Sequence, residues 1–278
     1  MNRIEFISII LVFIGLQLKA QTLSEEEVTE KMNQAFAFNQ SNNKTKALEL
    51  FLIVGENTEL QRHETERQVY VCSQTMACMC YNSLKKYKDG YLLAKKLLQG
   101  QLKDNEKKEI GYMYALNGYH YACNLIKRDE KGHAYYSRCR EVISEILPYM
   151  DDVLKKYAIP TIVKSWYFEG LQCAIAQKYD EALLTYTKAL EGFRNLGKIS
   201  EEIKVLNEMG FVKKQLNKLD ESKLLYHQAA ELARINGDTS KQLDALKELW
   251  KLGRTTGDME LVRSVTLSMD SLIEVSEN

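Results

Sequence analysis

Apolar residues at positions 166–196 recur with the three- and four-residue spacing of two helices that each bury one face. Trp166 and Gly170 lie one turn apart on the first predicted helix. Ala182, Tyr186 and Ala189 share one face of the second. Because protein interiors are close-packed, helices approach closely only where side chains are small. We therefore expect Gly170 to meet Ala182 at a close crossing, with Trp166 and Tyr186 filling the space around it.

This pattern returns twice, each time after forty residues. The second copy consists of Leu206, Gly210, Ser222, Tyr226 and Ala229. The third consists of Leu246, Trp250, Val262, Thr266 and Met269. Turn sequences at 236–238 and 256–258 each contain a Gly-Asp pair and fall between predicted helices. Two equal steps in one register indicate an internal repeat of helix pairs.

The first half of the chain predicts three weaker helix pairs, with turns expected at 41–43, 87–89 and 127–130. Extra residues follow the third pair, between Pro148 and Pro160. We expect residues 149–157 to form an added helical segment that ends this pair. These are the only two prolines in the sequence. Their scarcity favours helix throughout, because proline breaks helix interiors.

The residue types at Trp166, Gly170, Ala182, Tyr186 and Ala189 resemble those of the tetratricopeptide repeat. The resemblance implies an all-α fold, a right-handed superhelical solenoid of about six helix pairs. It covers residues 21–278, with the best copies at 163–196 and 203–236 and a third at 243–276. Repeat spacings of forty residues are similar to those of the longer-helix tetratricopeptide arrays of regulators and adaptors.

The N-terminal segment predicts export. Arg3 precedes an apolar run from Phe6 to Leu18, and the small residue Ala20 follows. This order is typical of a secretory signal peptide, here residues 1–20 with cleavage after Ala20, which implies a periplasmic or secreted protein. The run is shorter than the roughly 20 apolar residues that span a bilayer. An uncleaved N-terminal membrane anchor is the alternative.

Charge and motif content argue against nucleic-acid binding and catalysis. The 38 basic and 38 acidic residues cancel, so the chain lacks the positive field that nonspecific nucleic-acid binding requires. His63-Glu64 begins like a zinc-protease motif, but Arg67 stands where the second histidine belongs. The sequence contains no nucleotide-binding glycine loop and no nucleophile motif. We therefore expect no cofactor, no metal and no catalytic residue.

Six cysteines are the remaining candidates for special chemistry. Export invites a disulfide interpretation, but Cys78 and Cys80 lie on one predicted helix and point about 200° apart. The sequence contains no CxxC pair. We expect the cysteines to act as small buried apolar residues, with a disulfide or a metal site as the alternative.

The first helix of each stacked pair is expected to line a concave binding groove. Its residues are Phe36, Met79, Asn82, Tyr119, Lys127, Lys164, Tyr167, Lys204, Asn207, Phe211, Lys214, Lys247, Lys251 and Arg254. The C-terminal part of this set is basic, and the predicted groove holds almost no acidic or histidine side chain. Such a surface favours an acidic peptide or a carboxylate. A solvated, charged helix face is the alternative.

Tyrosines crowd residues 112–136 and offer a second candidate surface. They are Tyr112, Tyr114, Tyr119, Tyr121, Tyr135 and Tyr136. Residues three and four apart share a helix face, so not all of them can be buried. They either pack between helices or form a partly exposed aromatic patch.

A signal peptide joined to a divergent array is similar to the extracytoplasmic half of Bacteroidetes sensor and regulator proteins. The resemblance implies an exported interaction scaffold or ligand-sensing module within a signalling assembly. We expect it to bind a protein or peptide partner, with no nucleic acid and no membrane span after signal cleavage. The alternative is a helical-repeat enzyme, such as a lyase or glycan hydrolase, which would need convergent acidic or histidine groups in the groove.

Overall fold

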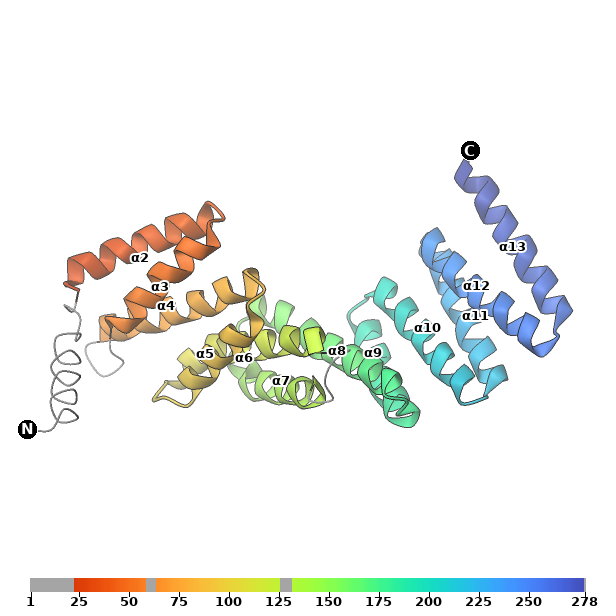
Figure 1. The fold of residues 1–278 in the computed structure, drawn as a ribbon, viewed down its shortest axis with the longest axis horizontal. Helices are drawn as coiled ribbons and strands as arrows, with labels where there is room; N and C mark the ends of the chain where they lie inside the picture. The colour runs from red at the N-terminus through yellow and green to blue at the C-terminus, as the bar shows by residue number, and fades with distance from the viewer. Residues whose placement is uncertain (1–22, 59–63, 126–131, 278) are drawn as a thin grey trace, which may run out of the picture. The chain divides into compact units, whose positions relative to one another are not determined.

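The computed structural model describes residues 23–58, 64–125 and 132–277. Within these ranges it contains twelve α-helices, one short 3-10 helix and no strand (Figure 1). The predicted all-α fold is confirmed. From α7 onward, each α-helix packs against the next along the chain, as expected for stacked helix pairs.

The chain divides into two compact units, Met1–Tyr114 and Ala115–Asn278. The described helices of the first unit are α2 (Glu25–Gln40), α3 (Lys44–Glu56), α4 (Glu64–Ser83), α5 (Tyr87–Leu98) and the first part of α6 (Asp104–Leu125). The second unit holds the rest of α6, then α7 (Gly132–Ile146), η1 (Leu147–Tyr149), α8 (Asp152–Ile175), α9 (Tyr179–Asn195), α10 (Ile199–Gln215), α11 (Leu219–Ile235), α12 (Thr239–Thr256) and α13 (Met259–Glu277).

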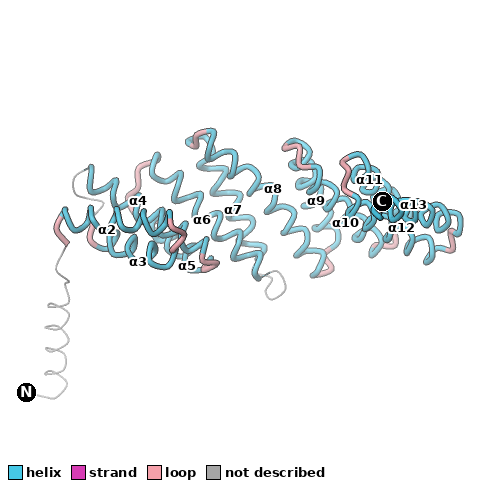
Figure 2. The backbone as a smooth tube through the Cα atoms, turned by 90° about the horizontal axis from the view of Figure 1, so that it is seen from above, coloured by secondary structure: helices cyan, strands magenta, loops and turns pink. Residues whose placement is uncertain are grey.

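The turns from α8 to α13 are built alike and recur every twenty residues (Figure 2). The residue with positive φ in each turn is Gln177, Gly197, Asn217, Gly237 or Gly257. The next amide then donates back across the turn, from Lys178 to the Cys173 carbonyl and from Lys218 to the Lys213 carbonyl, each at 2.9 Å. A left-handed residue closed by such a bond ends a helix. The forty-residue sequence repeat is therefore one pair of helices with two turns.

Gly170 of α8 accommodates the ring of a tyrosine on α9. A Cβ atom at Gly170 would lie 2.6 Å from the Tyr186 ring, and that ring is fully buried. The sequence predicted Ala182 as the partner of Gly170, but the closest atoms belong to Tyr186. The same arrangement recurs forty residues later between Gly210 and Tyr226. The crossing thus pairs a small residue with a large one, and the ring needs the space that the glycine leaves.

The extra residues between Pro148 and Pro160 lengthen a first helix. Pro148 lies in η1, and Asp151 caps α8 by accepting a hydrogen bond from the Leu154 amide at 2.8 Å. α8 then continues through Pro160 to Ile175. The prediction of an added segment that ends the third pair was therefore wrong. Proline costs an interior helix one backbone donor, and this helix continues despite that loss.

Each unit has its own core. In the first unit, Ala35, Phe51 and Ala77 bring α2, α3 and α4 together. The buried set of the second unit is dominated by residues of the repeats, among them Tyr186, Leu206, Tyr226, Ala229 and Leu249. The sequence repeats therefore mark the positions that pack between helices, as the pattern predicted.

The predicted signal peptide lies outside the described residues. None of the described helices combines the length and the apolar character that a bilayer crossing requires. All six cysteines are free thiols, and four of them, Cys78, Cys80, Cys139 and Cys173, are buried.

Candidate functional site

Four of the predicted groove residues line one hollow in the second unit, which we call the aromatic hollow. Its lining consists of Tyr119 of α6, Lys164, Tyr167 and Phe168 of α8, Phe193 of α9, and Glu201 and Lys204 of α10. Its volume is about 280 Å³. Residues from four helices converge here, and most of them belong to first helices of consecutive pairs.

The floor of the aromatic hollow is a set of edge-to-face rings. Phe168 lies 5.8 Å from Tyr119 and 5.1 Å from Tyr167 between ring centroids. Lys164, Tyr167 and Phe168 lie three and four residues apart on α8, so they share one face. Tyr119 is only 6% exposed, so it forms part of a fixed floor and does not project into solvent.

Lysines provide the positive charge around this floor. Lys164 and Lys204 are exposed, and neither forms an ion pair with a residue that the structure describes. Burial, and next the charge of Lys164, lower the pKa of His120, so this imidazole stays neutral at neutral pH. Burial raises the pKa of Tyr167 to about 12, and the charge of Glu208 adds to the effect. The aromatic hollow is therefore an apolar depression beside two ammonium groups and one carboxylate, Glu201.

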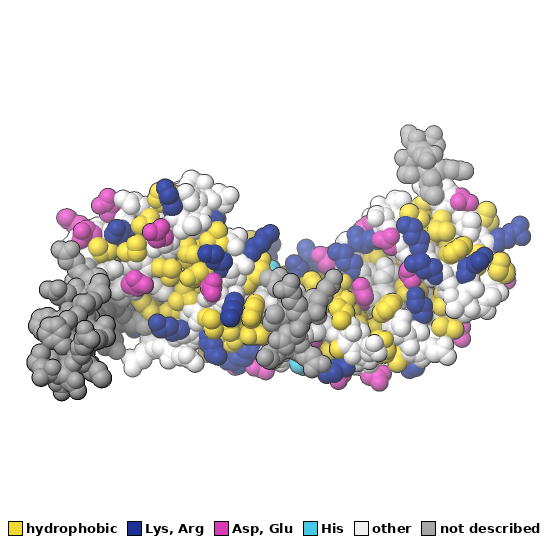
Figure 3. Space-filling model, viewed as in Figure 1, with side chains coloured by type: hydrophobic (Ala, Val, Ile, Leu, Met, Phe, Trp, Pro, Cys, Tyr) yellow, Lys and Arg dark blue, Asp and Glu magenta, His cyan; other side chains and the backbone are white. Residues whose placement is uncertain are grey.

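The predicted basic end of the groove is partly neutralised. Glu248 of α12 binds Lys214 at 3.1 Å and Lys251 at 2.6 Å. Lys247 lies 3.9 Å from Asp244. On the face shown in Figure 3, Lys and Arg side chains over α10 to α12 are interspersed with Asp and Glu side chains. The basic patch predicted there is thus a mixed-charge surface.

Three further predicted residues lie on α10 and α12 with distinct surroundings. Phe211 is 40% exposed, and the ammonium group of Lys214 lies 5.8 Å from its ring centroid. Arg254 lies over the Trp250 ring at 5.4 Å. The side-chain oxygen of Asn207 is buried and has no hydrogen-bond partner among the described residues. An unpaired buried acceptor is rare enough in proteins to need an explanation.

The remaining predicted residues lie elsewhere. Phe36 packs edge-on against Phe51 at 5.4 Å, Met79 is 44% exposed and Asn82 is half-buried, all within the first unit. Lys127 lies outside the described residues. The predicted groove residues are therefore distributed over both units, and the aromatic hollow is made by residues of the second unit alone.

Acidic side chains are the main component that the sequence analysis missed. It expected almost none in the groove, yet Glu201, Glu208 and Glu248 all lie on its first helices. Glu248 stands three residues before Lys251, a spacing that allows an ion pair on a helix. That spacing was the available signal. The aromatic residues Phe168 and Phe193 were not among the predicted groove residues, although Phe168 directly follows the predicted residue Tyr167.

The tyrosine-rich segment packs mainly between helices. Tyr112, Tyr114, Tyr119 and Tyr136 are each at most 8% exposed. Tyr121 and Tyr135 are half-buried and meet edge-to-face at 5.2 Å. Of the two interpretations of these tyrosines, the packing role holds for most of them, and Tyr119 reaches a binding surface only as the floor of the aromatic hollow.

Comparisons with known proteins concern the fold. No protein-family model matches the chain, and no curated protein matches it. Among solved structures it is similar to BtubC from P. vanneervenii, with 12% identity and a TM-score of 0.54 over 86% of this chain and 92% of that one. It is similar to the apo form of RapI, with 16% identity and a TM-score of 0.50 over 88% and 84% of the two chains.

A third solved structure is aspartyl phosphate phosphatase F from Bacillus subtilis. It has 10% identity and a TM-score of 0.50, covering 93% of this chain and 77% of that one. At these identities the likeness is one of fold. The chain has a tetratricopeptide-like helical-repeat fold.

Proposed function

We propose that this chain is an exported, noncatalytic scaffold or ligand-sensing module that binds a protein or peptide on the first-helix face of its second unit. One observation carries the proposal. Tyr119, Lys164, Tyr167 and Lys204 were chosen from repeat positions alone, and they line a single hollow. An apolar side chain of a partner fits the ring floor, and an acidic group beside it fits Lys164 and Lys204 through charge-assisted hydrogen bonds.

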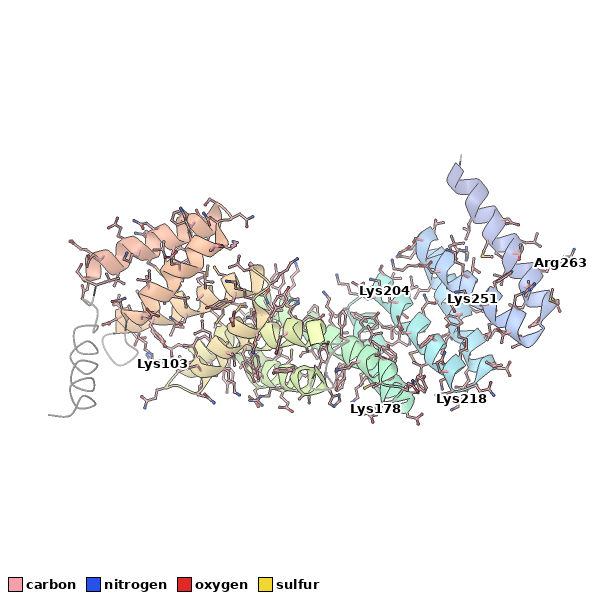
Figure 4. All side chains as sticks on the ribbon, in the orientation of Figure 1. Lys103, Lys178, Lys204, Lys218, Lys251 and Arg263 are labelled. Atoms are coloured by element: carbon pink, nitrogen blue, oxygen red, sulfur yellow. The ribbon has the colours of Figure 1, made fainter. Side chains whose placement is uncertain are left out.

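The test is retention of a partner by the mature chain and by charge-reversal variants. The double variant Lys164→Glu/Lys204→Glu should lose the protein that the wild-type chain retains from an envelope extract. The matched control is Lys178→Glu/Lys218→Glu, which reverses two exposed lysines in the turns before α9 and α11 (Figure 4). If both double variants lose the partner equally, the effect is one of net charge and the proposed face is wrong.

Export is part of the proposal and has its own test. A signal peptide over residues 1–20 leaves Gln21 at the N-terminus of the mature chain. Mass spectrometry of protein recovered from the envelope should find the chain beginning at Gln21. Recovery of the chain with Met1 would support the membrane-anchor alternative. Turnover of a glycan by the purified chain would support the helical-repeat enzyme instead.

A further inference from the structure

Glu208 and Glu248 occupy the same place in consecutive repeats, forty residues apart. Glu248 accepts hydrogen bonds from two ammonium groups: Lys214 of the preceding first helix at 3.1 Å and Lys251 on its own helix at 2.6 Å. Burial alone would raise the pKa of Glu248, but the bonds from Lys251 and Lys214 together lower it. At this place in the fold, a carboxylate is thus matched by two cations.

Glu208 occupies the position equivalent to Glu248, but the two lysines that bind Glu248 have no counterpart there. The residues that correspond to Lys214 and Lys251, forty residues earlier, are Ala174 and Phe211. Glu208 is half-buried and makes no ion pair or hydrogen bond with any residue in the described ranges. Burial raises its pKa, the opposite of the direction at Glu248. In the next repeat, the carboxylate at the equivalent position, Glu248, is bound by two lysines. Glu208 has no such partner among the described residues.

Two buried polar atoms of α9 and α10 also lack hydrogen-bond partners among the described residues. The Tyr186 side chain is fully buried, and its hydroxyl has no hydrogen-bond partner among the described residues. The Asn207 side-chain oxygen is also buried and also has no hydrogen-bond partner among the described residues. Tyr167 and Tyr186 lie 6.0 Å apart between ring centroids. For both phenols, burial is the first cause of a raised pKa, and the negative charge of Glu208 is the second.

We propose that Glu208 forms a subsite for one ammonium or guanidinium group, a Lys or Arg side chain of the bound peptide. This inference rests on the proposed function. A cation supplied by a ligand would give Glu208 the kind of partner that Lys214 and Lys251 give Glu248 one repeat later. The rings of Tyr167 and of the exposed Phe211 can add cation–π attraction. Removing a carboxylate from water without giving it a cation is costly, so the half-buried Glu208 gains most from a ligand that supplies one.

Lys204 makes the subsite part of a larger recognition surface. Lys204 and Glu208 are four residues apart on α10 and share one helix face. A peptide with an acidic side chain near Lys164 and Lys204, and a basic one near Glu208, would match both. The Lys204 side chain could instead form an ion pair with Glu208 on the same helix. The experiment must therefore distinguish this internal cation from one supplied by a ligand.

The experiment is an NMR titration of the full mature chain with N-acetylarginine amide. The neutral probe N-acetylcitrulline amide has nearly the same shape and serves as the control. The arginine probe should shift amide signals of α10 in a saturable manner, and the citrulline probe should not. In Glu208→Gln the apparent affinity should fall about tenfold or more, the size expected for losing a hydrogen bond to a charged group.

Matched variants identify the group responsible. Glu191→Gln removes an exposed carboxylate of α9 outside the aromatic hollow and should leave arginine binding unchanged. Lys204→Met removes the internal competitor and should leave binding unchanged or strengthen it. Phe211→Lys copies the arrangement at Glu248, so it should fill the subsite from within and abolish binding, whereas Phe211→Met should not abolish it.

Two results would overturn the subsite: equal shifts from the arginine and citrulline probes, or arginine binding that survives Glu208→Gln. The arginine titration tests the subsite separately from binding of the partner protein. If the partner is retained normally by Glu208→Gln and arginine does not bind, the subsite is wrong while the proposed face stands. If arginine binds through Glu208 but Lys164→Glu/Lys204→Glu retains the partner, the proposed face is wrong.

Discussion

At the scale of single residues, the opposite pKa shifts of Glu208 and Glu248 predict opposite effects on the stability of the fold. A carboxyl group whose pKa is raised in the folded state destabilises the fold once it is ionised, and one whose pKa is lowered stabilises it. Glu208 is of the first kind and Glu248 of the second. Both stand on first helices of the same repeat array, so they form a natural pair for comparison.

Glu208→Gln should therefore raise the melting temperature at neutral pH. The folded wild type binds the Glu208 proton more tightly than the unfolded chain, so the stability that this proton provides is fully present below the unfolded pKa of about 4.3. It is lost as pH rises through the higher folded pKa, and the glutamine variant avoids that loss. The advantage of the variant should thus shrink as pH falls towards 4.

Thermal unfolding between pH 3 and pH 8 measures this difference. Glu248→Gln is the control with the opposite sign: it should lower the melting temperature at neutral pH, and its deficit should shrink as pH falls through the lowered folded pKa. A Glu208→Gln variant that is less stable than wild type at pH 7 would show that Glu208 already has a cation in the free protein.

Gly170 gives a second prediction at this scale. Gly170→Leu should overpack the contact with the buried Tyr186 ring, where even a Cβ atom would lie at 2.6 Å, and cost about 1–3 kcal/mol. Gly210→Leu should behave alike against Tyr226. Denaturant unfolding measures both, with Ala134→Leu as a control because Ala134 is exposed on α7. Unchanged stability in both glycine variants would contradict the observed crossings.

At the scale of helices and turns, the forty-residue repeat of helix pairs is the property that the sequence revealed best. Gly237 and Gly257 were recognisable turn residues, because glycine adopts positive φ without strain. Gln177 and Asn217 adopt the same conformation with no comparable signal. The course of α8 was mispredicted because Pro160 reads as a helix end, although packing of the long helix against α7 and α9 keeps it continuous.

The N-cap residue, which directly precedes each helix, offers a test of this turn geometry. Lys218 and Asp238 both occupy the position before a helix, with similar backbone angles. Asp238 accepts a hydrogen bond from the Lys241 amide at 3.1 Å, whereas Lys218 makes no such cap. Lys218→Asp should supply the missing cap and stabilise the chain by about 0.5–2 kcal/mol.

Chemical denaturation of Lys218→Asp beside Lys218→Ala separates capping from loss of the lysine charge. The aspartate variant should be the more stable of the two. The reverse change, Asp238→Lys, should destabilise the chain by a similar amount. If Lys218→Asp is no more stable than Lys218→Ala, the turns are not equivalent in the way that their backbone angles indicate.

At the scale of the whole molecule, repeat register predicted which residues face the binding side but not what they bind there. Tyr119, Lys164, Tyr167 and Lys204 could be chosen from the sequence because equivalent positions of a repeat face the same way. The ion pair of Lys214 with Glu248 could not, because it depends on side-chain reach between neighbouring pairs. That Glu208 has no cation among the residues that the structure describes, whereas Glu248 has two, is seen only by comparing two repeats in three dimensions.

Site-specific photo-crosslinking in living cells tests the central claim, that a partner binds the first-helix face of the second unit, most directly. A photoreactive amino acid replaces Lys164 or Lys204 in one set of variants, and Lys178 or Lys218 in the control set. The account predicts that one partner protein is captured from positions 164 and 204 and not from positions 178 and 218. Capture from the turn positions alone, with none from 164 and 204, would contradict it.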